Sequence, residues 1–137
     1  MKKIFVETSV FIRFFTSDDE NKYLDCLKVF ELIEYGSIKP YTSNIVILEI
    51  IFILMRHYKF EKRKVLSAVK KLLSLRNLTL IETTNTKLSM TYFAKFNIKY
   101  GDCLIASQIP KGISLLTYDN DFSKVKAINV KTVKEIV

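Results

Sequence analysis

Histidine and cysteine are nearly absent from this sequence of 137 residues, which holds one histidine and two cysteines. Because His57 stands alone, the sequence excludes a metal site built from several histidines. It also excludes a Ser-His or Cys-His catalytic triad that does not use His57. Cys26 and Cys103 lie far apart in the chain and match no metal-ligand spacing. We therefore expect reduced thiols, as in a reducing compartment.

Glycine, proline and long apolar runs are also scarce. With three glycines and two prolines, no linker rich in these residues divides the chain, so we expect one domain over residues 1–137. The apolar stretch IVILEIIFILM at 45–55 is too short to cross a bilayer and carries Glu49. The N-terminal MKKIFVETSV has no long apolar segment with a small-residue cleavage site, which argues against a signal peptide. We expect a cytoplasmic protein with no membrane segment.

Acidic residues are outnumbered by basic ones, 14 against 22, and the formal net charge is +8 with a pI near 9.5. This balance favours an anionic partner, with nucleic acid as the first candidate. A well-solvated, lysine-rich surface would produce the same balance. Charge alone therefore does not identify a substrate.

Hydrophobic periodicity predicts strands that alternate with helices. The predicted strands cover residues 2–7, 38–42, 78–82, 113–117 and 128–132. The predicted helices begin near Ser9 and then cover 20–35, the segment around Glu49, 61–76, 84–96 and the stretch from Gly101 to before Pro110. This alternation predicts an α/β fold, a three-layer α/β/α sandwich with a central parallel sheet. In such sheets, ligands bind outside the carboxyl ends of the strands.

Glu49 is a single carboxylate in an otherwise apolar predicted helix. Its neighbours three and four positions away are Ile45, Val46, Phe52 and Ile53, and none of them can form a hydrogen bond with it. An unpaired carboxylate in an apolar setting is costly. We therefore expect Glu49 to be buried and to meet its partner in another part of the fold.

Three further carboxylates stand where the predicted fold would place a site. Glu7 ends the first strand, Asp119 follows the strand at 113–117, and Asp102 begins a helix. Each has a simpler interpretation as a helix cap or turn residue, which is favoured for Asp102 and Asp119 taken alone. Only the grouping of all four acids also accounts for Glu49.

Four converging carboxylates indicate a divalent cation. Without one, they would repel each other and destabilise the fold. Mg²⁺ and Mn²⁺ take oxygen ligands, and such an ion can stabilise the attacking and leaving oxygens of a phosphodiester displacement. A basic surface supplies contacts to a phosphate backbone. The combination predicts a nuclease.

Four segments in order resemble PIN-domain ribonucleases, in particular the VapC-type toxins of prokaryotic toxin–antitoxin pairs. They are ETSVFIRFFTSDD, SNIVILEI, GDCLIA and LLTYDNDF, and the resemblance covers nearly the whole chain. It implies a PIN-like fold, dependence on Mg²⁺ or Mn²⁺, and RNA as the substrate. It also implies a homodimer and inhibition by a cognate antitoxin protein.

Matched position by position, the resemblance implies one set of metal ligands and catalytic acids: Glu7, Glu49, Asp102 and Asp119. It also implies supporting roles, in which Thr8 and Ser9 would hold Glu7 and Thr117 would orient Asp119 through its hydroxyl.

Other positions have two interpretations. Asp121 would be a more distant metal ligand or a cap for the turn FSKV that follows it. Arg13 would bind the substrate. The basic helix from Lys59 to Lys71 would contact RNA or a partner, or would simply face solvent.

Glu7 departs from the family pattern, which ordinarily has aspartate at this position. The longer side chain adds one C–C bond of about 1.5 Å, and a shift of about 1 Å at a catalytic centre can cost roughly a hundredfold in rate. The leading hypothesis is a metal-dependent ribonuclease toxin, and the second is a PIN-like module that binds RNA or antitoxin without efficient turnover. A phosphoacceptor receiver domain is disfavoured, since Glu7 stands alone after the first strand and Glu49 would have no role.

Overall fold

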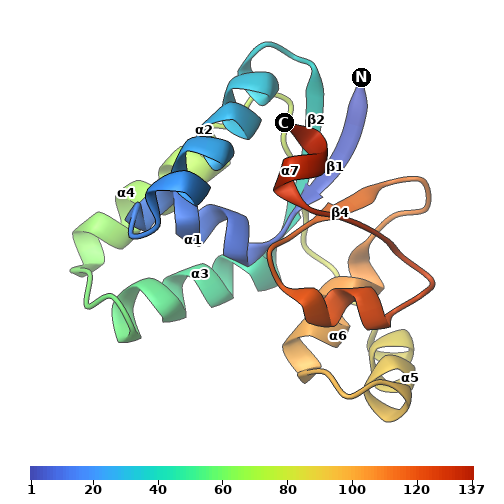
Figure 1. The fold of residues 1–137 in the computed structure, drawn as a ribbon. Helices are drawn as coiled ribbons and strands as arrows, with labels where there is room; N and C mark the ends of the chain where they lie inside the picture. Colours follow the sequence, from blue (N-terminus) through green and yellow to red (C-terminus); the bar gives the residue numbers. More distant parts are fainter.

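The computed structural model describes residues 1–137 and contains one parallel sheet (Figure 1). Its five strands are β1 (Lys2–Val6), β2 (Ile38–Ser43), β3 (Thr79–Ile81), β4 (Ser114–Leu116) and β5 (Asn129–Lys131). Their order in the sheet is β3-β2-β1-β4-β5, and each neighbouring pair is parallel. The predicted parallel sheet is therefore confirmed.

Seven α-helices and one short 3-10 helix surround the sheet. They are α1 (Thr8–Thr16), α2 (Glu20–Glu34), α3 (Asn44–Arg56), α4 (Lys62–Leu73), α5 (Thr86–Lys95), α6 (Tyr100–Gln108), η1 (Asn120–Lys124) and α7 (Val133–Ile136). Helix α1 packs against α2 and α3, α3 packs against α4, and α5 packs against α6 (Figure 1). This is the predicted three-layer α/β/α sandwich. None of the helices combines the length and the apolar character that a membrane span requires.

The helix boundaries follow local caps. The side chain of Asp19 accepts a hydrogen bond from the backbone N–H of Lys22 at 3.1 Å, and α2 ends before Gly36, whose φ is +80°. Ser43 caps α3 in the same way, accepting from the N–H of Val46 at 3.3 Å. Such caps pair backbone donors that a helix start leaves free. The sequence therefore contained the signals that place these helices.

Helix α3 contradicts one expectation, because Glu49 is only half-buried. The buried positions of α3 are Val46, Ile50 and Leu54, and the other side of the helix exposes Leu48 and Phe52 by 64% and 60%. An apolar pattern indicates which side chains are unfavourable in water. It does not indicate whether they are buried within the chain itself or against another molecule. The expected burial of Glu49 was therefore wrong.

The central strands also mark the point where the strand order reverses. The chain leaves β3 at one edge of the sheet and enters β4 on the other side of β1. Ligands bind outside the carboxyl ends of the strands at such a switch point. Glu7 directly follows β1, and Thr117 and Asp119 follow β4, so these residues lie at that position.

Candidate active site

All four predicted acids line one cavity of about 620 Å³, which is called the acid cavity below. Glu7 lies between β1 and α1, Glu49 in α3, Asp102 in α6 and Asp119 between β4 and η1. Each acid therefore comes from a different part of the chain. The structure brings together the four side chains that sequence reasoning had grouped.

Glu7 is held by three hydrogen bonds to one of its carboxylate oxygens. Oε1 accepts from the backbone N–H of Ser9 at 3.0 Å, from the Ser9 hydroxyl at 2.6 Å and from the Thr117 hydroxyl at 2.6 Å. Burial raises the pKa of Glu7, and the bonds from Ser9 and Thr117 act in the opposite direction. With Oε1 fixed in this way, Oε2 is the oxygen that is available to a further ligand.

Thr8 does not hold Glu7, in contrast to the role that the resemblance assigned to it. Its hydroxyl donates to Oε1 of Glu49 at 2.5 Å, across 41 positions of sequence. Successive residues of a helix point about 100° apart, so Thr8 and Ser9 at the start of α1 face different acids. Thr8 is therefore the hydrogen-bond partner that Glu49 was expected to meet in another part of the fold.

Asp102 is the most buried of the four acids, with an exposed fraction of 2%, and its Oδ2 has no hydrogen-bond partner. It lies inside the first turn of α6, whose cap is Lys99, so the helix-cap interpretation of Asp102 is wrong. Burial is the largest cause that raises the pKa of Asp102 from 3.8 to about 7. Lys99 lowers this pKa, whereas the carboxylates of Asp119, Glu49 and Glu7 raise it further.

Gly101 allows α6 to approach Glu49 closely. A Cβ atom at position 101 would lie 3.0 Å from Oε2 of Glu49, tighter than ordinary van der Waals contact. Any other residue at this position would therefore displace the Glu49 carboxylate or move α6.

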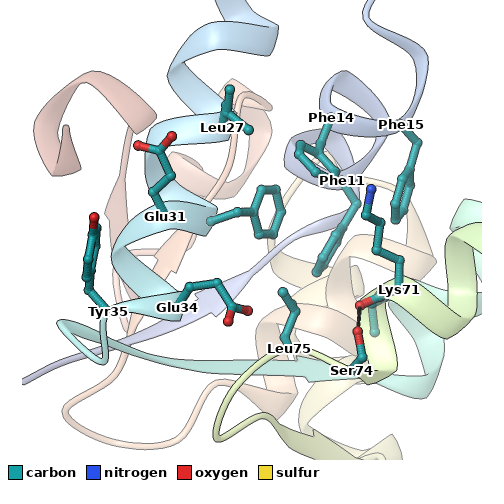
Figure 2. Close-up of a pocket in the computed structure, with 12 residues that line it drawn as sticks. Phe11, Phe14, Phe15, Leu27, Glu31, Glu34, Tyr35, Lys71, Ser74 and Leu75 are labelled. Carbon is teal, nitrogen blue, oxygen red and sulfur yellow. Dashed lines mark hydrogen bonds between the residues drawn. The ribbon is translucent and has the colours of Figure 1, made fainter.

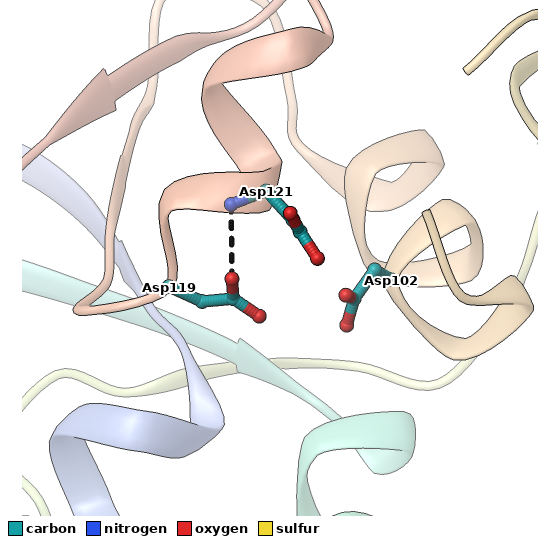
Figure 3. A group of neighbouring side chains, drawn as sticks. All are labelled: Asp102, Asp119 and Asp121. Carbon is teal, nitrogen blue, oxygen red and sulfur yellow. Dashed lines mark hydrogen bonds between the residues drawn. The ribbon is translucent and has the colours of Figure 1, made fainter. Parts of the chain in front are cut away.

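Asp121 was predicted to be a more distant metal ligand or a cap, but it lies close to two of the four acids. One carboxylate oxygen from each of Asp102, Asp119 and Asp121 lies within 4.8 Å of the others (Figure 3). The cap of η1 is Asp119, whose Oδ1 accepts from the N–H of Asp121 at 2.9 Å, so Asp121 is not the cap. Thr117 accepts from the N–H of Asp119 at 2.9 Å, and Asp121 pairs with Lys124 at 3.0 Å.

Two cations and a tyrosine share the acid cavity with the carboxylates. Arg13 lines it and donates to Asp18 at 3.1 Å, and Tyr58 donates to the other oxygen of Asp18 at 2.6 Å. The hydrogen bond from Tyr58 is the largest cause that lowers the pKa of Asp18, and the bonds from Thr16 and Arg13 act in the same direction. Sequence reasoning named Arg13 but missed Lys99 and Tyr58, because no local pattern shows that these residues meet the acids.

The donor set fits a hard divalent cation. The side chains that converge on the acid cavity offer carboxylate oxygens, the atoms that Mg²⁺ and Mn²⁺ bind in proteins. The unpaired Oδ2 of buried Asp102 and the mutual repulsion of the carboxylates are both relieved by a positive ion. The arrangement therefore suits metal binding better than a metal-free structural role.

Comparison with solved structures reveals the same fold in several proteins. They include the VapBC2 complex of Rickettsia felis bound to a DNA fragment from its promoter, with 18% identity, a TM-score of 0.67, and coverage of 95% of this chain and 98% of that chain. VapC20 of Mycobacterium tuberculosis, described as a Sarcin-Ricin loop cleaving toxin, has 21% identity, a TM-score of 0.66 and coverage of 88% and 93%. VapBC-1 of nontypeable Haemophilus influenzae has 13% identity, a TM-score of 0.69 and coverage of 96% and 98%.

Identities this low show a shared fold alone, and no match is found among the curated proteins compared with the sequence. The family is shown instead by sequence, since the profile of the PIN domain matches residues 4–128. That match includes all four acids of the cavity. On this evidence the chain belongs to the PIN domain family.

Proposed function

We propose that this protein is a metal-dependent endoribonuclease and the toxin of a toxin–antitoxin pair. The observation that carries the proposal is the convergence of four carboxylates, from four parts of the chain, in one cavity of a PIN domain. RNA as the substrate is supported by the net charge of +8 and by the similarity to a loop-cleaving toxin. The proposal places the protein in the cytoplasm, where the buried thiols of Cys26 and Cys103 stay reduced.

The acids have a common role in this proposal, which is to hold Mg²⁺ or Mn²⁺. The ligands would be Glu7, Glu49, Asp102 and Asp119, with Asp121 as a further candidate because its carboxylate lies beside those of Asp102 and Asp119. When bound, such an ion stabilises the charge that develops in a phosphodiester displacement and lowers the pKa of a water molecule. The protein contributes fixed positions: Ser9 and Thr117 orient Glu7, and Thr8 orients Glu49. Asp102 would have to release its proton before it could bind the ion, because a ligating carboxylate is ionised.

Arg13 and Lys99 would bind the substrate phosphates beside the acids. Both line the acid cavity, and the side chain of Arg13 is 31% exposed although it contacts Asp18. Phosphate groups approaching four carboxylates need nearby positive charge. These two residues supply it inside the cavity itself.

Cleavage of RNA by the purified protein tests the proposed function. We expect cleavage with Mg²⁺ or Mn²⁺, loss of cleavage on addition of a chelator, and loss with Asp102→Asn. Glu34→Gln, which removes a charge outside the acid cavity, should cleave like the parent. If Asp102→Asn cleaved as fast as the parent, the catalytic assignment would be wrong. RNA that is bound but never cut would instead favour the binding module without turnover. In that case Glu7→Asp, which introduces the acid usual in the family, should produce cleavage.

An apolar groove of about 500 Å³ supports an antitoxin partner, and it shares no lining residue with the acid cavity. Phenylalanines of α1 face residues of α2 and α4 across it (Figure 2). Glu31 and Glu34 of α2 lie on one side and Lys71 of α4 on the other. Such a groove fits an amphipathic segment whose apolar side chains insert between the rings and whose basic residues meet the glutamates.

The antitoxin segment is our proposed occupant of this groove, in line with the VapBC complexes of similar fold. Coexpression with the product of a small neighbouring gene tests it. The complex should form with the parent protein and fail with Leu27→Glu, which places a charge in the groove. RNA cleavage by Leu27→Glu should match that of the parent. A complex that formed equally well with this variant would contradict the proposed position.

Apolar side chains exposed on α3 and α5 support a homodimer. On α3 they are Leu48 and Phe52, and on α5 they are Met90 and Phe93, which are 50% and 48% exposed. Both helices pack against α6. Large apolar side chains that a fold leaves exposed are candidates for an interaction site. We propose that a second copy of the chain covers it.

A further inference from the structure

A groove of about 530 Å³ lies where the loop after α3 meets the first turns of α4, and it is called the basic groove below. Six residues line it: Lys59, Phe60, Glu61, Arg63, Lys64 and Ser67. Three of them are cations and one is an acid. None of the three cations forms an ion pair within the protein. The groove therefore presents positive charge that is free to meet an external anion.

The basic groove and the acid cavity are lined by neighbouring residues of the chain. Tyr58 lines the acid cavity, and the next two residues along the chain, Lys59 and Phe60, line the basic groove. The rings of Tyr58 and Phe60 lie 6.2 Å apart between centroids. Tyr58 is fixed by its hydrogen bond to Asp18, the acid that also anchors Arg13. Cations thus lie on both sides of Tyr58, with Arg13 at the acid cavity and Lys59 in the basic groove.

The local backbone and the aromatic ring hold the cations in place. Lys59 has a φ of +59°, a backbone conformation that residues other than glycine rarely adopt. This conformation turns the chain after α3. The N–H of Phe60 donates to the carbonyl of Leu54 at 2.9 Å and secures this turn. The Lys64 ammonium lies 4.0 Å from the centroid of the half-buried Phe60 ring. A cation over an aromatic face is attracted to it, so Phe60 positions Lys64.

We propose that the basic groove binds the backbone of the RNA strand on one side of the bond that is cut. This inference rests on the proposed nuclease function and adds the direction in which the substrate leaves the acid cavity. The acid cavity gathers four carboxylates and so repels a phosphate backbone, with only Arg13 and Lys99 to oppose that repulsion. Affinity for a polyanion must then come largely from cations outside the cavity. The basic groove offers three of them on a surface that adjoins it.

RNA rather than an acidic peptide is the occupant that the position favours. A strand with its scissile phosphate at the acids has to leave the acid cavity, and the Tyr58–Phe60 turn joins that cavity to the basic groove. Backbone contacts made by lysine and arginine bind any sequence and weaken as salt displaces them. The groove would therefore strengthen binding without choosing the RNA sequence.

Two double variants of α4 test the inference. Arg63→Gln/Lys64→Gln removes two charges from the basic groove, and Lys62→Gln/Lys70→Gln removes two exposed charges from the same helix outside it. The probe is a labelled single-stranded RNA of roughly twelve nucleotides, bound in chelator so that no cleavage occurs. Loss of two phosphate contacts should weaken binding about tenfold and reduce the slope of log affinity against log salt by about 1.4. The control pair should change affinity less than about twofold.

Cleavage kinetics with metal separate this inference from the proposed function. The groove variant should raise KM and leave kcat unchanged, because its residues do not touch the reacting atoms. Equal weakening by both double variants, or parental affinity in the groove variant, would overturn the inference while cleavage by the parent still supported the nuclease. A groove variant that bound RNA normally but lost its antitoxin would also overturn it. Absence of any RNA cleavage by the parent would instead contradict the proposed function, and the binding data would still decide whether the groove holds RNA.

Discussion

The carboxyl of Asp102 should make the stability of the metal-free protein depend on pH. Its pKa in the folded protein is about 7, against an ordinary value of 3.8. Between these values the folded protein keeps a proton that the unfolded chain has released, so raising the pH favours unfolding. Each unit of pH would lower the free energy of unfolding by up to about 1.4 kcal/mol. Denaturant unfolding in chelator should therefore show a more stable protein at about pH 5 than at about pH 8.

Asp102→Asn is the matched control for this prediction, because the amide keeps the shape of the side chain and stays neutral at every pH. The variant should be more stable than the metal-free parent at about pH 8, and its stability should fall less between about pH 5 and 8. Burial also raises the pKa of Glu7, so the variant would keep a dependence of the same sign. Identical pH profiles for parent and variant would show that Asp102 is ionised throughout.

Gly101→Ala should separate the stability of the fold from metal affinity. Gly101 is the second residue of α6, and alanine within a helix is favoured over glycine by up to about 1 kcal/mol, which should offset part of the cost of the new contact. The added Cβ would lie 3.0 Å from Oε2 of Glu49 and push that carboxylate by a few tenths of an ångström. We expect unchanged or slightly higher resistance to denaturant and severalfold weaker binding of Mn²⁺ by calorimetry.

A second glycine provides the control for Gly101→Ala. Gly112 has a φ of +83° and nothing within 4 Å of an added Cβ. Gly112→Ala should therefore lower stability through its backbone conformation and leave Mn²⁺ affinity unchanged. If Gly101→Ala bound Mn²⁺ as tightly as the parent, the Glu49 carboxylate would not need its present position.

At the scale of elements, the parts with local signals could be predicted from the sequence. The strand expected at 2–7 is β1 (Lys2–Val6), and the helix expected at 20–35 is α2 (Glu20–Glu34), because alternation, periodicity and caps are properties of neighbouring residues. The grouping of the acids was also accessible, since parallel strands end at one edge of the sheet. Helix α7 was missed because four residues are too few for a periodic pattern.

What the sequence could not supply was the packing between elements. The hydrogen bond from Thr8 to Glu49 exists because α1 packs against α3, a contact that joins segments far apart in the chain. Lys99 and Tyr58 enter the acid cavity from helix ends for the same reason. The burial of α3 was misjudged because composition does not distinguish a side chain covered by the fold from one covered by a partner.

The exposed apolar face of α3 allows a prediction about the oligomeric state. Leu48→Ser/Phe52→Ser removes the two most exposed apolar side chains of this helix and should convert a dimer into a monomer in sedimentation experiments. Leu66→Ser/Leu73→Ser is the control, since these leucines are 52% and 49% exposed on α4. The control should sediment like the parent. A parent that is monomeric at micromolar concentration would contradict the proposed dimer.

At the scale of the whole molecule, the acid cavity exists only when the chain is folded. Its acids at positions 7, 49, 102 and 119 are brought together by packing of the sheet with α3 and α6. A divalent ion that needs all of them binds the folded state and not the unfolded one. Such an ion stabilises the fold by about 2.7 kcal/mol at a concentration a hundredfold above its Kd. Burial raises the pKa of Asp102 most, the repulsion between the acids raises it further, and the ion relieves this repulsion at the same time.

Thermal unfolding with and without Mn²⁺ measures this coupling. For a domain of this length, the stabilisation corresponds to a rise in Tm of about 10 °C. The rise should vanish with Asp102→Asn and shrink with Gly101→Ala, because both alter the ligands. Arg63→Gln/Lys64→Gln should keep the full rise, since the basic groove lies outside the ligand set. An equal rise in the parent and in Asp102→Asn would mean that the ion binds elsewhere, and the acid cavity would then lose its assignment as the metal site.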